Sequence, residues 1–313
     1  MSYSDILNWL LEGDVSVQYQ LNRDLLSIDR PDLRERIGTE GFGAKFLSCR
    51  RSNGHWGNKF YHPKWTSTHY TLLDLRNLCL DPTLPSVRES IQIIVDNEKA
   101  VDGGILSIGP NRLSDLCING MFLNYASYFQ TNEKDLKSVV DCILNEAMPD
   151  GGFNCRSNRM PTFHSSMHTT ISVLEGVTEY QKNGYIYKSA ELEKVKLSSI
   201  EFLLMHQLFL SDRTGEIIDP NFLKLVYPCR WKYDILRALD YFQYEGIPWE
   251  DRLQPAIEVI IDKRKKSGVW DNYSKHPGQV HFEMEKAGQP GRWNTLRALR
   301  VFKYFGIEIQ NRN

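Results

Sequence analysis

The sequence predicts an all-α protein in which helical hairpins close into a ring, an (α/α)6 toroid. The first observation is a unit that recurs five times, each copy beginning with a tight glycine turn and continuing into an apolar helix. The turns are Asn53-Gly54-His55-Trp56, Asp102-Gly103-Gly104-Ile105, Asp150-Gly151-Gly152-Phe153, Thr214-Gly215-Glu216-Ile217 and Ser267-Gly268-Val269-Trp270. The second observation is the spacing of 48 to 64 residues between successive turns, which is typical of one supersecondary unit used repeatedly. Because each unit needs its neighbours to cover its apolar face, we expect residues 1–313 to form a single domain.

The segment before the repeats, residues 1–50, is expected to form the first hairpin. Residues 5–11 have the pattern of a short amphipathic helix. Residues 16–26 place apolar side chains on one face, and Asp14 precedes them as an N-cap residue. Pro31 then opens a helix that reaches about residue 50, with a break expected at 38–43.

The five repeats occupy residues 51–305 and alternate two kinds of helix. Apolar helices are predicted over 66–78, 117–129, 166–180, 232–244 and 293–304. Helices with a polar stripe are predicted over 86–97, 133–146, 189–209 and 251–266. A helix that is apolar all round is buried, whereas a striped helix faces solvent. The alternation therefore predicts two concentric layers, with six inner helices once 16–26 is counted.

The composition excludes several functional classes. The chain has 38 Lys and Arg against 39 Asp and Glu, so its net charge of −1 provides no global attraction to nucleic acid or an anionic membrane. No run of apolar residues is long enough to span a bilayer. The polar N-terminus and six dispersed cysteines lead us to expect a cytoplasmic protein with reduced thiols.

Polar and aromatic residues gather where the inner helices are expected to begin. In a toroid these helix ends meet at one mouth, where unpaired N–H groups favour an anion. We expect this mouth to bind the substrate through Trp65, His69, Tyr70, Asn119, His164, Trp231, Trp293 and Asn294. Helix capping and core packing are the alternative roles for the same residues.

Candidate groups for proton transfer occur at three places. His168 begins one expected inner helix, and Tyr233 with Asp234 begins another, with Arg230 placed to clamp an anion. His281 and Glu283 alternate with apolar residues in a long loop, so an extended strand would point both in the same direction. A structural Arg–Asp ion pair and an ordinary surface loop are the alternatives.

The layout resembles the superfamily of squalene cyclases and protein prenyltransferase β-subunits. The resemblance covers residues 45–305 and is carried by the glycine turns and by phrases such as His168-Thr-Thr-Ile-Ser-Val-Leu-Glu-Gly176. It extends to bacterial proteins labelled squalene cyclase-like, through Pro63-Lys-Trp-Thr-Ser-Thr68, Tyr227-Pro-Cys-Arg-Trp231 and Gly291-Arg-Trp-Asn-Thr295. The resemblance implies an α/α toroid enzyme with an isoprenoid or other hydrophobic substrate in a central aromatic-lined cavity.

The prenyltransferase β-subunits also suggest a zinc site. They hold zinc with an Asp-x-Cys pair and a later His-Thr, and this chain has Asp115-Leu-Cys117 followed by His168-Thr169. A carboxylate, a thiolate and an imidazole form a chemically sensible open zinc site. Those enzymes need a partner subunit, which nothing in this sequence identifies. The acidic Asp-x-Asp-Asp cluster of the triterpene cyclases is absent.

Two other functions are compatible with the same fold. One is a hydrolase or lyase that acts on sugars, whose pockets also combine aromatic rings with carboxylates. The other is a toroid that binds a ligand or a protein without catalysis. An open funnel that ends in titratable groups would favour an enzyme, whereas a plugged mouth would favour a binding module.

Overall fold

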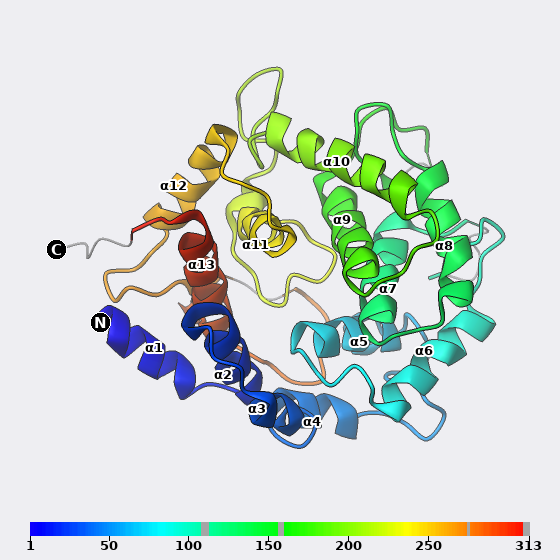
Figure 1. Ribbon diagram of the computed structural model, residues 1–313, viewed down its shortest axis with the longest axis horizontal. Coiled ribbons are helices and arrows are strands. Elements are labelled where there is room, and N and C mark those ends of the chain that lie inside the picture. Colours follow the sequence, from blue (N-terminus) through cyan, green and yellow to red (C-terminus); the bar gives the residue numbers. More distant parts are fainter. Residues whose placement is uncertain (108–112, 156–159, 274–275, 309–313) are drawn as a thin grey trace.

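The computed structural model describes residues 1–107, 113–155, 160–273 and 276–308. It forms a helical ring of two layers (Figure 1). The inner layer consists of α2 (Val15–Leu21) with its π-helical extension η1 (Asn22–Leu26), α5 (Thr68–Asn77), α7 (Leu116–Tyr128), α9 (Met167–Lys182), α11 (Ile235–Glu245) and α13 (Arg292–Phe305). The outer layer consists of α1 (Tyr3–Leu11), α3 (Pro31–Arg36), α4 (Gly41–Ser48), α6 (Pro85–Asn97), α8 (Glu133–Asn145), α10 (Ser189–Met205) and α12 (Gln254–Asp262).

Short elements complete the described chain. They are the 3-10 helices η2 (Lys64–Thr66), η4 (Pro220–Leu223) and η5 (Asp251–Leu253), and the two-residue strands β1 (Asp271–Asn272) and β2 (Gln289–Pro290), which pair antiparallel. The strand expected over 280–283 is not formed. None of the helices in the described ranges is long and apolar enough to cross a membrane.

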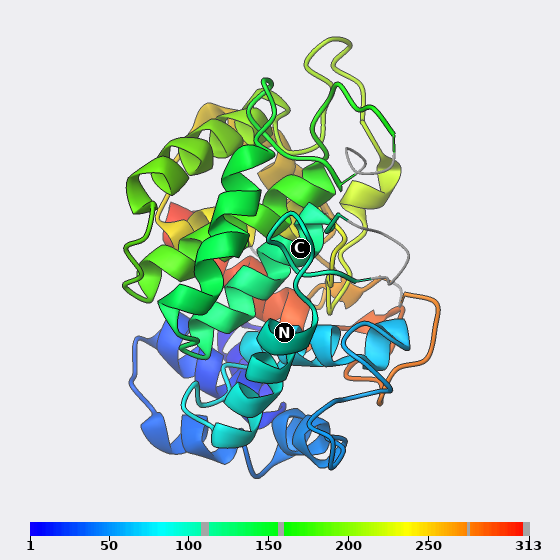
Figure 2. The ribbon, with the colours of Figure 1, turned by 90° about the vertical axis from the view of Figure 1, so that its right-hand side faces the viewer.

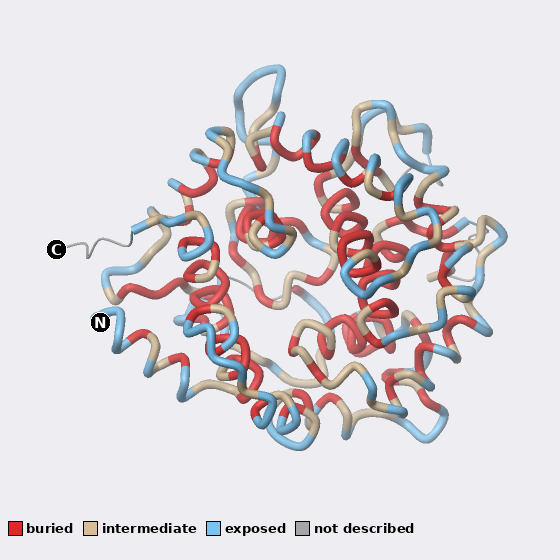
Figure 3. Tube along the Cα trace, viewed as in Figure 1, coloured by how far each residue is buried: buried red, intermediate tan, exposed pale blue. Residues whose placement is uncertain are grey.

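Burial separates the two layers as the apolar pattern predicts. In α7, α9 and α13 most side chains are buried, whereas α6 and α8 bury one face and expose the other (Figure 3). The long loops that precede α9, α11 and α13 lie on the same face of the ring in the side view of Figure 2. That face is where the inner helices begin, so any mouth formed by their amino ends lies there.

All five glycine turns adopt the backbone that the sequence predicts. Their second-position glycines have φ values between +71° and +98°, a region that side chains other than glycine rarely enter. Four of these glycines pack against the next outer helix along the ring, where an added Cβ would meet Ile93 (Gly54), Ser138 (Gly103), Ser198 (Gly151) or Ile6 (Gly268). The last of these contacts joins the fifth turn to α1 and so helps to close the ring.

A hydrogen bond repeats between each of four turns and the inner helix that follows it. The backbone N–H two residues after the glycine donates to a Thr or Asn side chain in the first turn of that helix. The pairs are Trp56 to Thr68 (3.1 Å), Ile105 to Asn119 (2.7 Å), Phe153 to Thr170 (3.0 Å) and Trp270 to Thr295 (3.1 Å). These four residues therefore mark equivalent positions in their helices.

The C-terminal helix closes the ring onto the N-terminal hairpin. Arg300 on α13 donates to the carboxylate of Asp24 at 3.0 Å and to the side chain of Gln20 at 3.2 Å. Lys303 donates to the carbonyl oxygens of Asp24 and Leu25, both at 3.0 Å. Polar contacts therefore join the last helix, α13, to the α2–η1 segment near the start of the chain.

Helices α7 and α9 approach more closely than side chains would allow, because glycines face each other at the contact. A Cβ added at Gly120 would collide with the carbonyl oxygen of Ser172, and one added at Gly176 would collide with the carbonyl oxygen of Gly120. Both collisions are with backbone atoms, which cannot rotate away.

We therefore expect Gly120→Ala to lower the free energy of unfolding by about 1–3 kcal/mol, the usual cost of overpacking. Gly38→Ala is the matched control, since a Cβ there meets only the side chain of Leu80 at 3.7 Å and the backbone oxygen of Glu35 at 3.8 Å. Urea unfolding followed by circular dichroism measures both variants. Equal stability of the two would show that the helix contact is not tight.

Candidate functional site

Two cavities within the part of the chain that the structure describes contain most of the predicted residues that line any cavity, and another, of about 370 Å³, contains only Trp293 among them. The mouth cavity has a volume of about 1010 Å³ and lies at the amino ends of α7 and α9, lined among others by Tyr61, Lys64, Asp115, Cys117, Cys155, His164, His168, Thr169, His206, Phe222 and Trp231. The axial cavity has a volume of about 480 Å³ and is lined among others by Gln20, Asp24, Arg76, Tyr128, Glu175, Tyr227, Arg230, Arg237, Asp240, Trp293, Arg297 and Arg300. Both volumes suit a small-molecule site.

The residues predicted to share one mouth are divided among four places. The mouth cavity contains Asp115, Cys117, His164, His168 and Trp231. The axial cavity contains Arg230 and Trp293. A third cavity, of about 40 Å³, contains Trp65, His281 and Glu283 and also reaches Arg230. The others are buried in the core: His69, Tyr70, Asn119, Tyr233, Asp234 and Asn294.

The buried members of the predicted site hold the fold together. Asn119 receives the repeated turn hydrogen bond described above. Asp234 caps α11 by accepting from the N–H of Arg237 at 2.8 Å, and Tyr233 donates its hydroxyl to the carbonyl oxygen of Leu208 at 2.6 Å. Helix α11 therefore begins at Ile235, three residues later than predicted, and its cap residue Asp234 lines neither the mouth cavity nor the axial cavity.

Two further members are held by contacts inside the wall of the ring. The amide of Asn294 donates to the carbonyl oxygens of Leu225 and Asp271, both at 3.0 Å. The imidazole of His69 is fully buried, with Nδ1 3.2 Å from the hydroxyl of Tyr125. Burial lowers the pKa of His69 to about 3, so this ring is neutral and structural.

The hydrogen bonds of His168 determine which of its nitrogens carries the proton. Nδ1 lies 2.8 Å from the backbone N–H of Tyr233, which can only donate, so Nδ1 is the acceptor. The neutral ring therefore carries its proton on Nε2. Burial, with a contribution from Arg237, lowers the pKa of His168 to about 4. At neutral pH His168 is a hydrogen-bond donor and not a base.

The predicted zinc ligands do not fit zinc in this arrangement. Zinc needs a free lone pair on imidazole, and the Nδ1 lone pair of His168 is already used while Nε2 carries the proton. Among the described residues, no three His, Cys, Asp or Glu side chains are grouped so as to hold a metal ion. Asp115 and Cys117 line the same cavity as His168 without forming a ligand set with it.

The loop that contains His281 and Glu283 is packed onto the start of α5. Nε2 of His281 lies 3.0 Å from the hydroxyl of Thr71, and Trp65 donates its indole N–H to the carbonyl oxygen of Pro277 at 2.6 Å. The predicted His–carboxylate pair does line one cavity, but a volume of about 40 Å³ has room for little more than a water molecule. We therefore assign this loop to the wall of the ring.

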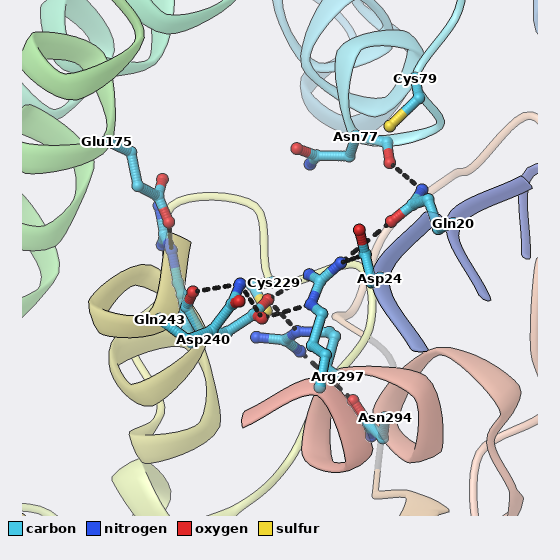
Figure 4. A network of polar contacts seen from close by, with 12 residues as sticks. Gln20, Asp24, Asn77, Cys79, Glu175, Cys229, Asp240, Gln243, Asn294 and Arg297 are labelled. Carbon is cyan, nitrogen blue, oxygen red and sulfur yellow. Dashed lines mark hydrogen bonds and ion pairs between the residues drawn. The ribbon is translucent and has the colours of Figure 1, made fainter. Parts of the chain in front are cut away.

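The axial cavity is the place where all six inner helices meet. Each contributes at least one lining side chain: Gln20 from α2, Arg76 from α5, Tyr128 from α7, Glu175 from α9, Arg237 from α11 and Arg297 from α13. Figure 4 shows Gln20, Glu175 and Arg297 extending from three separate helices toward a common space. Six arginines and three carboxylates are among its described lining residues.

Buried ion pairs connect these helices across the axis. Arg300 donates to Asp240 through Nε and Nη2, both at 2.5 Å, and Arg297 donates to the same carboxylate at 3.1 Å. Arg237 forms a two-pronged pair with Glu175 at 2.8 and 2.6 Å. Arg76 pairs with Glu179, which lies just behind the cavity wall. Paired arginines of this kind hold a fixed geometry around the cavity.

Arg230 and Arg297 are among the lining arginines that retain N–H groups beyond their hydrogen bonds to described residues. Arg297 uses Nε and Nη1, the latter toward Asn294 at 3.3 Å. Arg230 uses Nη1 toward the carbonyl oxygen of Trp65 at 3.3 Å, while its Nη2 lies 3.6 Å from Asp74, a distance typical of an ion pair without a hydrogen bond. Burial raises the pKa of Asp74 to about 6.

Tyr227 is one of four tyrosines among the described residues that line the axial cavity. Its ring stacks on that of Trp293 with centroids 4.7 Å apart, and it lines the cavity together with Arg230 and Arg297. Burial raises the pKa of Tyr227 well above its ordinary value, so the phenol keeps its proton. A buried neutral phenol is a proton donor.

Of the six described arginines that line the axial cavity, only Arg230 was predicted from the sequence, although a repeat marks two of the others. Residues 235–247, ILRALDYFQYEGI, and 295–307, TLRALRVFKYFGI, share the phrase Leu-Arg-Ala-Leu. This places Arg237 and Arg297 at the same position of α11 and α13. An arginine repeated within two otherwise buried helices is a signal for a polar axis, because charged side chains are rarely buried without partners.

Comparison with known proteins gives no relationship in sequence, since no protein-family model and no curated protein matches the chain. Among solved structures, a polysaccharide lyase matches with a TM-score of 0.51 and 12% identity, over 99% of this chain and 100% of that one. A type II terpene cyclase from Scytonema matches with a TM-score of 0.35 and 13% identity, over 96% and 98%. The likeness to the lyase shows a shared α/α toroid fold.

Because His168 is neutral in the folded protein, the free energy of unfolding depends on pH. The ordinary pKa of 6.5 in the unfolded chain exceeds the value of about 4 in the folded chain, so the unfolded chain binds the proton first as pH falls. Stability is therefore lost between pH 6.5 and about 4, by about 3 kcal/mol from this residue. His168→Asn keeps an acceptor for Tyr233 and does not titrate.

We expect His168→Asn to lose less stability than the wild type across that pH range. Urea unfolding at a series of pH values measures the difference between the two proteins, so the contributions of other histidines cancel. Parallel stability curves would show that folding does not shift the pKa of His168.

Proposed function

We propose that this protein is an enzyme that acts on an acidic carbohydrate, and that one acidic sugar unit binds in the axial cavity. The observation that carries the proposal is the arginine-rich lining of this cavity, to which all six inner helices contribute. Guanidinium groups recognise carboxylates in a two-pronged geometry. The likeness in fold to a polysaccharide lyase is compatible with this class of substrate.

The lining argues against a purely hydrocarbon substrate in this cavity. Charged and amide side chains such as Arg297, Asp240 and Gln243 would lose hydration against an isoprenoid chain without gaining partners. A sugar instead offers many hydroxyl groups that both donate and accept. It also has flat apolar faces that suit the rings of Tyr227 and Trp293. A carbohydrate substrate is therefore favoured over an isoprenoid substrate.

The chemistry that this arrangement supports best is elimination next to a carboxylate. Arg230 and Arg297 have N–H groups that can pair with the carboxylate of the sugar. The neighbouring C–H gives its proton to a lining carboxylate, for which Glu175 is the most exposed candidate, and neutralisation of the sugar carboxylate stabilises the carbanion that forms. Tyr227, which keeps its proton because burial raises its pKa, donates it to the departing glycosidic oxygen. The product is an unsaturated sugar.

A ligand panel tests the substrate class. Acidic oligosaccharides, namely oligogalacturonate and oligoglucuronate, are compared with neutral glucose oligomers of equal length and with geranyl diphosphate. We expect the acidic sugars alone to raise the melting temperature, and one of them to yield a product with the ultraviolet absorbance of a conjugated double bond. Stabilisation by the neutral sugars to the same extent, or by geranyl diphosphate alone, would refute the proposal.

Two variants test the role of the phenol. Tyr227→Phe keeps the ring on Trp293 and removes the proton donor, so we expect kcat to fall by roughly 100-fold or more. Tyr187→Phe is the matched control, since its hydroxyl contacts Asp141 on the outer helix α8 at 3.1 Å, away from the cavity. An unchanged kcat in Tyr227→Phe would show that this phenol is not the proton donor.

A further inference from the structure

A pair of thiols lies in the mouth cavity, apart from the axial site. Cys155 follows the third glycine turn, Cys117 is the second residue of α7, and both line the cavity. The backbone N–H of Cys117 donates to Sγ of Cys155 at 3.0 Å. The hydroxyl of Thr169, in the first turn of α9, donates to the same sulfur at 3.4 Å. One sulfur therefore lies at the amino ends of two long inner helices.

These contacts favour the thiolate of Cys155. The first N–H groups of a helix have no acceptor within it, and the positive end of the helix dipole stabilises a nearby anion. The hydrogen bond from the Cys117 thiol lowers the pKa of Cys155 and raises that of Cys117. Lys64 and Asp115 line the same cavity and contribute one charge of each sign.

The surroundings of the other buried thiols are different. Burial raises the pKa of Cys142 to about 11 and that of Cys229 to about 12, so both remain protonated. Cys229 donates its S–H to the carbonyl oxygen of Val226 at 3.1 Å. Cys49 is half-buried at the end of α4, as Cys155 is half-buried at the mouth, and provides a reference thiol of similar exposure.

We propose that Cys155 and Cys117 form a redox-active dithiol that reacts with small disulfides entering the mouth cavity. The Cys155 thiolate attacks one sulfur of the disulfide, whose S–S bond breaks and releases one half as a thiol after it takes up a proton. Cys117 then loses its proton and attacks Sγ of Cys155, which releases the second half. Two electrons pass from the cysteines to the small disulfide, which leaves as two thiols.

The product is a Cys117–Cys155 disulfide in the wall of the mouth cavity. It joins the loop after the third glycine turn to the start of α7, two elements that the ring already holds in contact. The reaction needs no group from the axial cavity. The reaction of the two thiols is therefore independent of the proposed carbohydrate chemistry.

The test is incubation of the reduced full-length protein with oxidised glutathione, followed by intact-mass measurement and peptide mapping. We expect the wild type to form the Cys117–Cys155 disulfide without a retained adduct. Cys117→Ser should instead retain glutathione on Cys155, because the second attack is lost. Cys155→Ser should form neither product, and the control Cys49→Ser should behave as the wild type.

Labelling of the unmodified protein provides a measurement that does not depend on any variant. With limiting iodoacetamide at neutral pH, we expect Cys155 to be alkylated several-fold faster than Cys49. Alkylation of Cys155 at the same rate as Cys49 or slower overturns the proposal. So does the absence of a glutathione adduct in a Cys117→Ser variant whose circular dichroism matches the wild type.

Discussion

The structure depends on the pairing of charges along the axis of the ring. Arg300 on the last helix contacts Asp240 on α11 and Asp24 beside α2, so one guanidinium connects three of the six inner elements. An unpaired charge at this depth would be strongly destabilising, whereas a fully paired one is tolerated. Asp24 also pairs with its neighbour Arg23, and closure of the ring adds Arg300 as a second partner. Closure therefore extends the pairing of charges that the inner helices bury.

This constraint also explains why the molecule has two cavities of different character. The axis must stay polar, which makes the axial cavity suited to a charged and hydroxylated ligand. The segment between Tyr227 and Trp231 forms part of the boundary, since Arg230 lines the axial cavity and Trp231 lines the mouth cavity. The mouth collects helix amino ends and with them the thiol of Cys155. Each cavity thus has chemistry set by its place in the ring.

Much of the fold could be predicted from the sequence, but the site could be predicted only in part. The repeated hydrogen bond makes Thr68, Asn119, Thr170 and Thr295 equivalent. If the inner helices are aligned on their apolar rows instead, so that Leu72 and Leu123 match Ile171 and Leu296, helices α9 and α13 are displaced by three residues. Three residues are almost one helical turn, so the apolar rows coincide in either register. In the register that the repeated hydrogen bonds define, His168 is equivalent to Cys117. His69 is a core residue.

The sequence by itself determined the repeats, the turns and the two layers, because these depend on local properties. Glycine alone reaches a positive φ without strain, and apolar periodicity within one helix decides which helices are buried. Only the tertiary structure decided which side chains face a cavity. That outcome depends on the rotation of each helix about its axis and on charges paired between helices far apart in the chain, such as Arg300 with Asp24. Neither quantity is encoded in the pattern of a single helix.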